Sequence, residues 1–316
     1  MAADPVRIAT YHTELERRHP GLFLRDLGRD ALDIAHVLAQ MEDVNADVWV
    51  LQGIDYDFGG QAIATLAGRA GYAHWLSAAP NTGRRSGVDL DGDGTVGGPR
   101  DAQGYGWFSG QGAMAVLSRY PLTLVAERTA DIWADLPWAT LPVSSDGSPF
   151  LSAEARAAQR LSTTAHWAID VAAPSGTFTL LTAHATAPVF DGPEDRNGYR
   201  NADELRLLLD MLGAVDGPVV IAANLNLDPD GGAGQREVAA TLLADPRLQD
   251  PHPGQPSADF GAESAGKLRV SYVLPTTHWR VVAAGVAWSD VPTPKGDIRF
   301  TRHHPVWADL VLDSGG

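Results

Sequence analysis

The sequence predicts an α/β fold in a single domain spanning residues 1–316, and three observations lead to this prediction. Short β-rich runs alternate with amphipathic helical patterns along the whole chain. No internal repeat, low-complexity linker or shift in composition marks the boundary of a second domain. Hydrophobic residues make up 44% of the chain and charged residues 20%, which is the composition of an ordinary globular protein.

The expected strands are short runs of apolar and β-branched residues that end at turn-forming residues. The clearest is DVWVLQ, residues 47–52, which has the pattern of a buried strand. The others cover residues 6–11, 113–118, 177–183, 218–224, 268–274, 281–288 and 306–312.

Four segments have the pattern of an amphipathic helix. The first is expected to be capped by Asp30, with Leu32, Ala35, Leu38 and Met41 on one face. The others cover residues 60–70, 205–212 and 237–243. Asn201 with Glu204 resembles a capping box and predicts the start of the helix over 205–212.

Long loops rich in Gly, Pro and Asp separate these elements at residues 81–105, 188–199 and 228–234. Loops of this length in a compact domain usually have a function or bind ions. The tryptophans are expected in the core and not in a ligand site, namely Trp107, Trp138, Trp167, Trp279 and Trp307.

The formal net charge is −15, from 39 acidic residues against 24 Lys and Arg. Such a surface repels polyphosphate backbones, so general nucleic-acid binding is not expected. The expected partner is a small-molecule substrate. Arginines gather at Arg17, Arg18, Arg25 and Arg29, a run that is more often a solvated face than a basic patch.

No run of about 18 apolar residues is present, so we expect a soluble protein with no membrane partner. Cysteine is absent, which excludes disulfides and thiolate chemistry but leaves the compartment open. The Ala-Ala-Asp-Pro start would suit a mature exported protein as well as a cytoplasmic one.

Six segments, taken in order, resemble the signature of the endonuclease/exonuclease/phosphatase superfamily. They are RIATYHTEL, DVWVLQGID, GQGAMAVLSRYPL, LLTAHATAP, VVIAANLNLDP, and LRVSYVLP with the closing TRHHPVWADL. They extend from Arg7 to Leu310, and their order and spacing make the resemblance specific. It implies a four-layer α/β sandwich of the DNase-like type, with two packed mixed β-sheets flanked by helices.

The resemblance also implies metal-dependent hydrolysis of phosphate esters, with Mg²⁺ or Mn²⁺ as the cofactor. On this basis His303 matches the general-base histidine, and His184 and Asn226 match the groups that hold the phosphate.

Five other positions depart from the family pattern. His12 replaces an Asn beside the metal, Gly53 a metal-binding Glu, and Arg302 a metal-site Asp. Asn224 replaces the Asp that contacts the nucleophilic water, and Ser271 the Asp that orients the base. General-base assistance contributes about 10²–10⁴-fold, so these changes predict weak or altered phosphoesterase activity.

The chain is most similar to a bacterial branch of the superfamily, through residues 51–57, 89–94, 188–198 and 243–251. Gly53 and Arg302 look usual in that branch. His12, Asn224 and Ser271 are then the changes particular to this chain.

Several residues are candidates for binding. Asp89, Asp91 and Asp93 resemble the first half of a Ca²⁺ loop, with Arg100 where a bidentate Glu is expected; an acidic surface turn is the alternative. His12, His184 and His303 together would suit Zn²⁺, unless His12 only hydrogen-bonds in a polar pocket. Asp55 or Asp57 is a candidate replacement for the missing metal-binding Glu, and a role in the turn is the alternative. Candidate substrate-binding residues are Tyr105, Asp191, Arg196 and Arg302.

Three hypotheses of function follow. The first is a hydrolase of a phosphate ester or related small substrate, with His303 as base and Asn224 positioning water. The second is a pseudoenzyme that keeps the fold as a binding module. The third is a non-hydrolytic His-based enzyme, such as an isomerase or cyclase, on the same scaffold.

Overall fold

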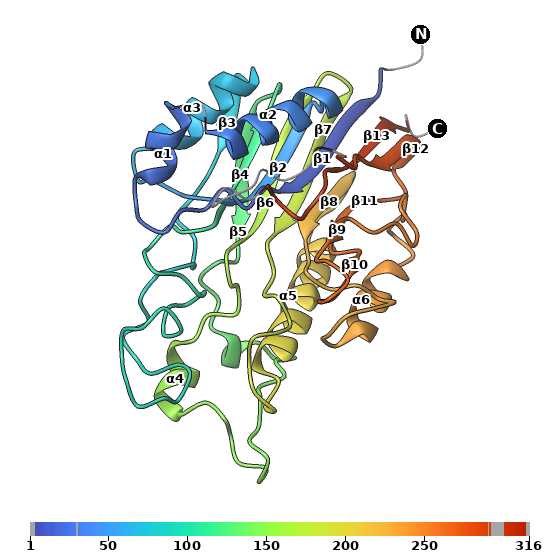
Figure 1. The fold of residues 1–316 in the computed structure, drawn as a ribbon. Coiled ribbons are helices and arrows are strands. Elements are labelled where there is room, and N and C mark those ends of the chain that lie inside the picture. The colour runs from blue at the N-terminus through green and yellow to red at the C-terminus, as the bar shows by residue number, and fades with distance from the viewer. Residues whose placement is uncertain (1–3, 30, 290, 292–299, 314–316) are drawn as a thin grey trace.

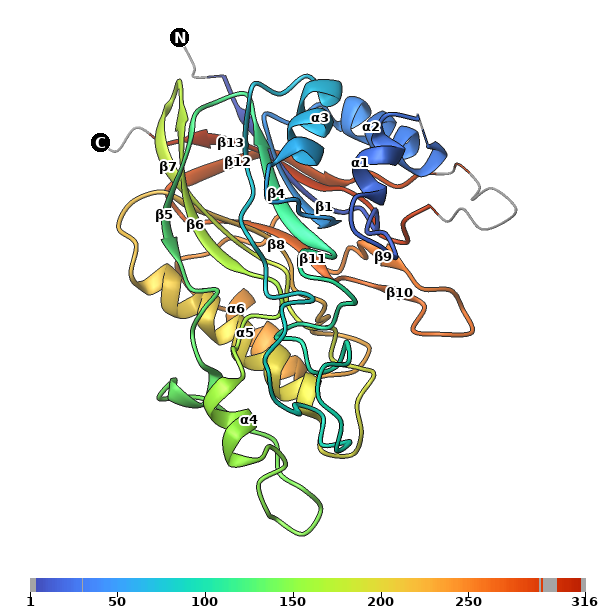
Figure 2. The ribbon, with the colours of Figure 1, turned by 90° about the vertical axis from the view of Figure 1, so that its left-hand side faces the viewer.

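The fold, described from a computed structural model, contains two β-sheets that pack face to face (Figures 1 and 2). The description covers residues 4–29, 31–289, 291 and 300–313. The six-stranded sheet has the order β12 (Trp279–Val286), β13 (Val306–Leu312), β1 (Val6–His12), β2 (Val48–Ile54), β4 (Ala113–Ser118) and β3 (His74–Leu76). The five-stranded sheet has the order β11 (Ser271–Pro275), β8 (Val219–Asn224), β7 (Gly176–Ala183), β6 (His166–Ala173) and β5 (Leu122–Glu127). A separate two-stranded pair contains β9 (Ala258–Asp259) and β10 (Lys267–Leu268).

Helices cover the outer face of each sheet, which makes four layers (Figure 2). The six-stranded sheet packs against α1 (Leu22–Leu27), α2 (Leu32–Val44) and α3 (Gln61–Ala70). The five-stranded sheet packs against α5 (Arg196–Gly213) and α6 (Arg236–Leu243), with α4 (Ala153–Ala158) and the short 3₁₀ turn η1 (Trp133–Asp135) nearby. The predicted four-layer α/β sandwich is therefore confirmed.

Strand alternation explains how the layers form. In β2, Val48 and Val50 point between the sheets, whereas Trp49 and Leu51 point at the helices. Facing side chains such as Trp167 and Phe178 fill the space between the sheets from the other side. Both sheets are mixed, since β1 and β2 run parallel while β2 and β4 run antiparallel, and β7 and β8 run parallel.

Two of the expected elements are wrong in detail. The third helix does not begin at a capping box, because α5 starts at Arg196 and contains Asn201 and Glu204. Both side chains are buried and bind loop backbone instead: Asn201 Nδ2 donates to the carbonyl of Leu225 at 2.7 Å, and Glu204 accepts from the Thr186 amide at 2.6 Å. The expected strand over 268–274 is divided into β10 and β11. The expected cap Asp30 lies outside the described residues.

None of the helices within the described ranges is long and apolar enough to cross a membrane.

The packing between the sheets gives a first prediction. Phe178 is 1% exposed and lies edge-on to Trp279, with ring centroids 5.2 Å apart. Phe178→Ala should lower the free energy of unfolding by about 3–5 kcal/mol, because it leaves a cavity between the sheets. Urea unfolding would measure the change. Val125→Ala, at a 51% exposed position on β5, is the control and should change it by less than about 0.5 kcal/mol.

Candidate functional site

Five of the predicted site residues meet where strands of the two sheets end, namely His12, His184, Asn224, Asn226 and His303. His12 is the last residue of β1 in one sheet, and Asn224 is the last residue of β8 in the other. His184 directly follows β7 and forms an isolated parallel bridge with Asn224. The rings of His184 and His303 lie 4.6 and 4.3 Å from the ring of His12, centroid to centroid.

His12 is at the centre of a hydrogen-bonded chain. Its Nδ1 atom is 3.0 Å from Asn224 Nδ2 and 3.1 Å from His303 Nε2. Asn224 Nδ2 can only donate, so His12 Nδ1 is an acceptor and the second contact requires a proton on His303 Nε2. A neutral His303 then has its lone pair on Nδ1.

In this tautomer none of the described carboxylates orients His303. His303 is 3% exposed, and its Nδ1 atom has no hydrogen-bond partner. The hydroxyl of Ser271, 2% exposed, has none either. Ser271 pairs with Asn224 across β11 and β8, so the position expected to orient the base does lie beside the site. A serine hydroxyl is too short to hold the imidazole as a carboxylate would.

The three imidazoles are neutral at physiological pH. Burial lowers the pKa of His184 to about 4. Burial, together with the positive charge of Arg302, lowers the pKa of His303 to about 3. Burial, reinforced by His303 and His184, holds the pKa of His12 well below its usual value. No carboxylate hydrogen-bonds to any of the three within the described residues.

Gly53 is coupled to His12. It has a φ of +70°, and a Cβ atom there would lie 2.7 Å from two atoms of the His12 ring and 2.9 Å from the Glu14 amide nitrogen. The His12 ring therefore occupies the space that a side chain at position 53 would need. A metal-binding carboxylate cannot stand at position 53 in this arrangement.

Glu14 is the carboxylate nearest the histidines in sequence, and Arg302 neutralises it. Glu14 Oε2 accepts from the Arg302 amide at 2.8 Å, and Oε1 accepts from Nε of the same residue at 2.9 Å. Burial opposes ionisation, but the hydrogen bonds and charge of Arg302 outweigh it and lower the pKa of Glu14. Sequence analysis did not single out Glu14.

These residues do not fit the Mg²⁺ or Mn²⁺ that the family resemblance implies. Hard divalent cations need carboxylate ligands that are free to coordinate. Glu14 is paired with Arg302, and Asp55 accepts from the amides of Arg17 at 2.9 Å and Gly112 at 3.1 Å. Burial raises the pKa of Asp55 to about 6. The charged neighbours of Glu16 are Glu14, Asp55 and Arg17, not the histidines.

The histidines do not form a zinc site in this conformation either. Within the described parts of the chain, one group of three or more possible ligand residues has its ligand atoms within 4.8 Å of one another, and it lies elsewhere. His12 instead hydrogen-bonds within a polar pocket, which is the alternative that the sequence left open.

That other group lies in the expected Ca²⁺ loop and contains Asp89, Asp91 and Asp101. Asp93 is exposed and accepts from the Thr95 amide, so Asp101 takes the place that the sequence gave to Asp93. The Asp101 carboxylate already accepts from the amides of Leu90, Gly97 and Gly98. Calcium binding at this loop stays a prediction.

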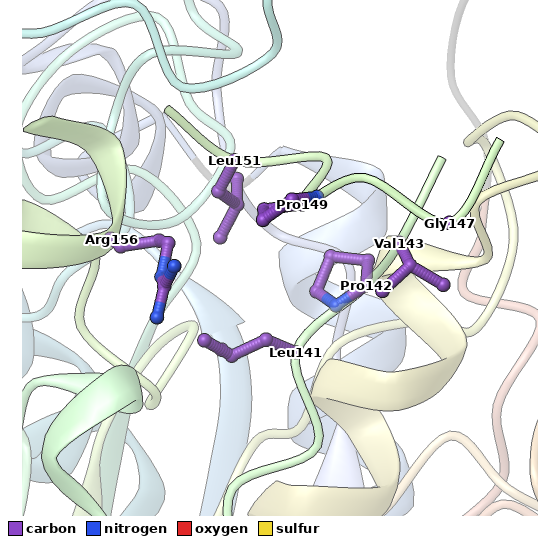
Figure 3. Close-up of a pocket in the computed structure, with 7 residues that line it drawn as sticks. All are labelled: Leu141, Pro142, Val143, Gly147, Pro149, Leu151 and Arg156. Carbon is purple, nitrogen blue, oxygen red and sulfur yellow. The ribbon is translucent and has the colours of Figure 1, made fainter. Parts of the chain in front are cut away.

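The remaining candidates lie outside the histidine cluster. Asp191 accepts from the amide of Asn197, at the start of α5, and Arg196 donates to the Leu90 carbonyl at 2.6 Å. Arg196 thus ties α5 to the acidic loop. Tyr105 is 60% exposed. A cavity of about 170 Å³ beside α4 is lined by Leu141, Pro142, Val143, Gly147, Pro149, Leu151 and Arg156 (Figure 3). Its lining is mainly apolar and offers no pair of groups for acid–base chemistry.

Comparison with known proteins agrees with the fold. The chain matches the Endonuclease/Exonuclease/phosphatase family over residues 21–303 and therefore belongs to that family. No protein of curated function matches it significantly.

Three solved structures show the same fold. An endonuclease/exonuclease/phosphatase from Beutenbergia cavernae DSM 12333 has a TM-score of 0.59 and 20% identity, covering 98% of this chain and 72% of that one. Sphingomyelinase C from Streptomyces griseocarneus has a TM-score of 0.56 and 18% identity, covering 97% and 99%. The human Nocturnin catalytic domain, with bound sulfate anion, has a TM-score of 0.50 and 14% identity, covering 99% and 96%.

The low pKa of His303 predicts how stability depends on pH. The folded protein protonates His303 only near pH 3, whereas the unfolded chain does so near about pH 6.5, so stability falls as the pH drops between these values. His303→Gln should reduce this slope by up to about 1.4 kcal/mol per pH unit. Urea unfolding at several pH values would measure it. Val125→Ala removes no titrating group and should leave the slope unchanged, and an equal slope in both variants would contradict the assignment.

Proposed function

We propose that this protein binds a small phosphate ester at the histidine cluster and has lost most of the family's hydrolytic activity. The observation that carries the proposal is the hydrogen-bonded chain from Asn224 through His12 to His303. In this chain the nitrogen of His303 that faces His12 is a donor, so it cannot take a proton from water. The atom that could accept one, Nδ1, is buried.

Phosphate recognition does not need a carboxylate. Neutral imidazole and amide N–H groups donate to phosphoryl oxygens, and a buried site strengthens such bonds. His12, His184 and Asn226 are partly exposed and supply these groups at the edge of the sandwich. The paired Glu14 and Arg302 add no net negative charge that would repel an anion. A sulfate anion bound to the structurally similar Nocturnin catalytic domain is consistent with this class of ligand.

Water activation is the step that this site lacks. Asn224 has the shape of an Asp but accepts no proton, and Ser271 cannot set the tautomer of His303. Among the described residues, this cluster offers no free carboxylate to hold a metal that would stabilise a leaving group. This arrangement can therefore bind a phosphate ester but cannot accept a proton from water.

Two measurements on the same protein test the proposal. Titration calorimetry should detect binding of phenyl phosphate, and His184→Ala should weaken it at least about tenfold by removing one donor. Hydrolysis of phosphate mono- and diesters with Mg²⁺, Mn²⁺, Ca²⁺ or Zn²⁺ should not exceed the rate of His184→Ala or of a chelator control. Metal-dependent turnover that His184→Ala abolishes would overturn the proposal in favour of a working hydrolase.

Restoring the missing proton acceptors gives a further prediction. The triple variant His12→Asn, Asn224→Asp and Ser271→Asp should increase phosphoesterase activity by at least about 10²-fold, because it supplies a base and its orienting carboxylate. The matched control is His12→Asn with Asn224→Ala and Ser271→Ala, which changes the same positions without carboxylates. If the first variant instead loses an activity that the unaltered protein has, the protein is an enzyme of different chemistry.

A further inference from the structure

A second cavity has an aromatic and cationic lining. It measures about 520 Å³ and is lined by Arg18, His19, Pro20, Trp107 and Phe108. Trp107 is 65% exposed, so its expected place in the core is wrong. Tyr105, on the same loop, is 60% exposed. Tyr105 and Trp107, two residues apart in the sequence, are thus both exposed to solvent.

The loop that carries Trp107 is held rigidly. The Trp107 amide donates to Gln111 Oε1 at 2.7 Å, and Gln111 Nε2 donates to the Arg17 carbonyl at 2.8 Å. The backbone is packed so closely that a Cβ atom on Gly83 would lie 1.7 Å from the Phe108 carbonyl oxygen. An exposed ring on a fixed backbone loses little conformational entropy when a ligand stacks on it.

Arg18 supplies the cationic part of this lining and is exposed in an otherwise acidic protein. Its neighbour Arg17 contacts Asp26 and Asp33 at 2.9 Å each, and Arg25 contacts Asp26 at 2.7 Å. Arg18 is exposed and makes no ion pair or hydrogen bond with the described residues. The protein as a whole has a net charge of −15. The exposed guanidinium of Arg18 beside Trp107 is therefore a local site that favours the binding of anions and planar rings.

Asp55 connects this cavity to the histidine cluster. It lies two residues after Gly53, whose backbone touches the His12 ring, and it accepts from the amides of Arg17 and Gly112. The path from Gly53 to Arg18 runs along the chain to Asp55, through its side chain and hydrogen bond to the Arg17 amide, and one residue further. Its full length limits the separation of the Gly53 and Arg18 Cα atoms to about 20 Å. A mononucleotide and an arginine side chain together cover that length.

We propose that this cavity binds the planar aromatic group of a phosphate ester whose phosphate lies at the histidine cluster. This inference rests on the proposed function and deepens it, because it names the class of organic group on the ligand. The ring stacks on Trp107, and the guanidinium of Arg18 packs against the ring or pairs with a second anionic group. The ligand is a small molecule of nucleotide size, since the acidic surface disfavours a long polyanion.

The test compares two esters that differ only in the aromatic ring. Calorimetry should give adenosine 5′-monophosphate at least about fivefold tighter binding than ribose 5-phosphate. Trp107→Ala should remove this preference, weakening the nucleotide by about 5- to 100-fold and leaving ribose 5-phosphate unchanged. Arg18→Ala should weaken the nucleotide in the same direction. Trp75→Ala, at a 39% exposed tryptophan on β3, is the control and should change neither affinity.

The outcomes separate this inference from the proposed function. Equal affinities for the two esters, or a ring preference that survives Trp107→Ala, would overturn the aromatic subsite alone. Binding of neither ester would overturn the proposed phosphate site and with it this inference. A nucleotide affinity that depends on Trp107 but not on His184 would uphold the ring site and overturn the phosphate site.

Discussion

The packing of two sheets against each other is the constraint on which the whole site depends. Trp167, Phe178 and Trp279 hold the sheets at a fixed separation through a buried apolar layer. Because β1 belongs to one sheet and β8 to the other, His12 and Asn224 meet only when this layer is intact. The hydrogen bond between these two residues therefore depends on the apolar burial that holds the sheets together.

Much of the fold could be predicted from the sequence because strand alternation is a local signal. The runs at 113–118 and 306–312 coincide with β4 and β13. The start of α5 could not be predicted, since Asn201 and Glu204 have the spacing of a cap yet bind loops distant in sequence. The strands β3, β5, β6 and β9 were missed. β3 and β9 are only three and two residues long, and most of β5 is exposed although it belongs to the five-stranded sheet.

Part of the site could also be predicted, because its residues lie in short motifs, whereas the contacts between distant segments could not. Family resemblance named His12, His184, His303, Asn224 and Asn226, which the fold brings together. It could not indicate that Arg302 is paired with Glu14, because a side-chain pairing between residues so far apart depends on tertiary contacts. Nor could it place Trp107 in solvent, since aromatic residues are buried more often than not. Asp101 shows the same limit, as its place beside Asp89 follows from how the loop closes on itself.

The contact between His12 and Gly53 couples substitutions at the two positions. A side chain at position 53 collides with the imidazole, so any larger residue there requires the His12 ring to move. Moving the ring is not sufficient, because a Cβ atom at position 53 would still lie 2.9 Å from the Glu14 amide nitrogen on a backbone with a φ of +70°. A larger residue at position 53 therefore requires a shift of the backbone that carries Glu14, the partner of Arg302.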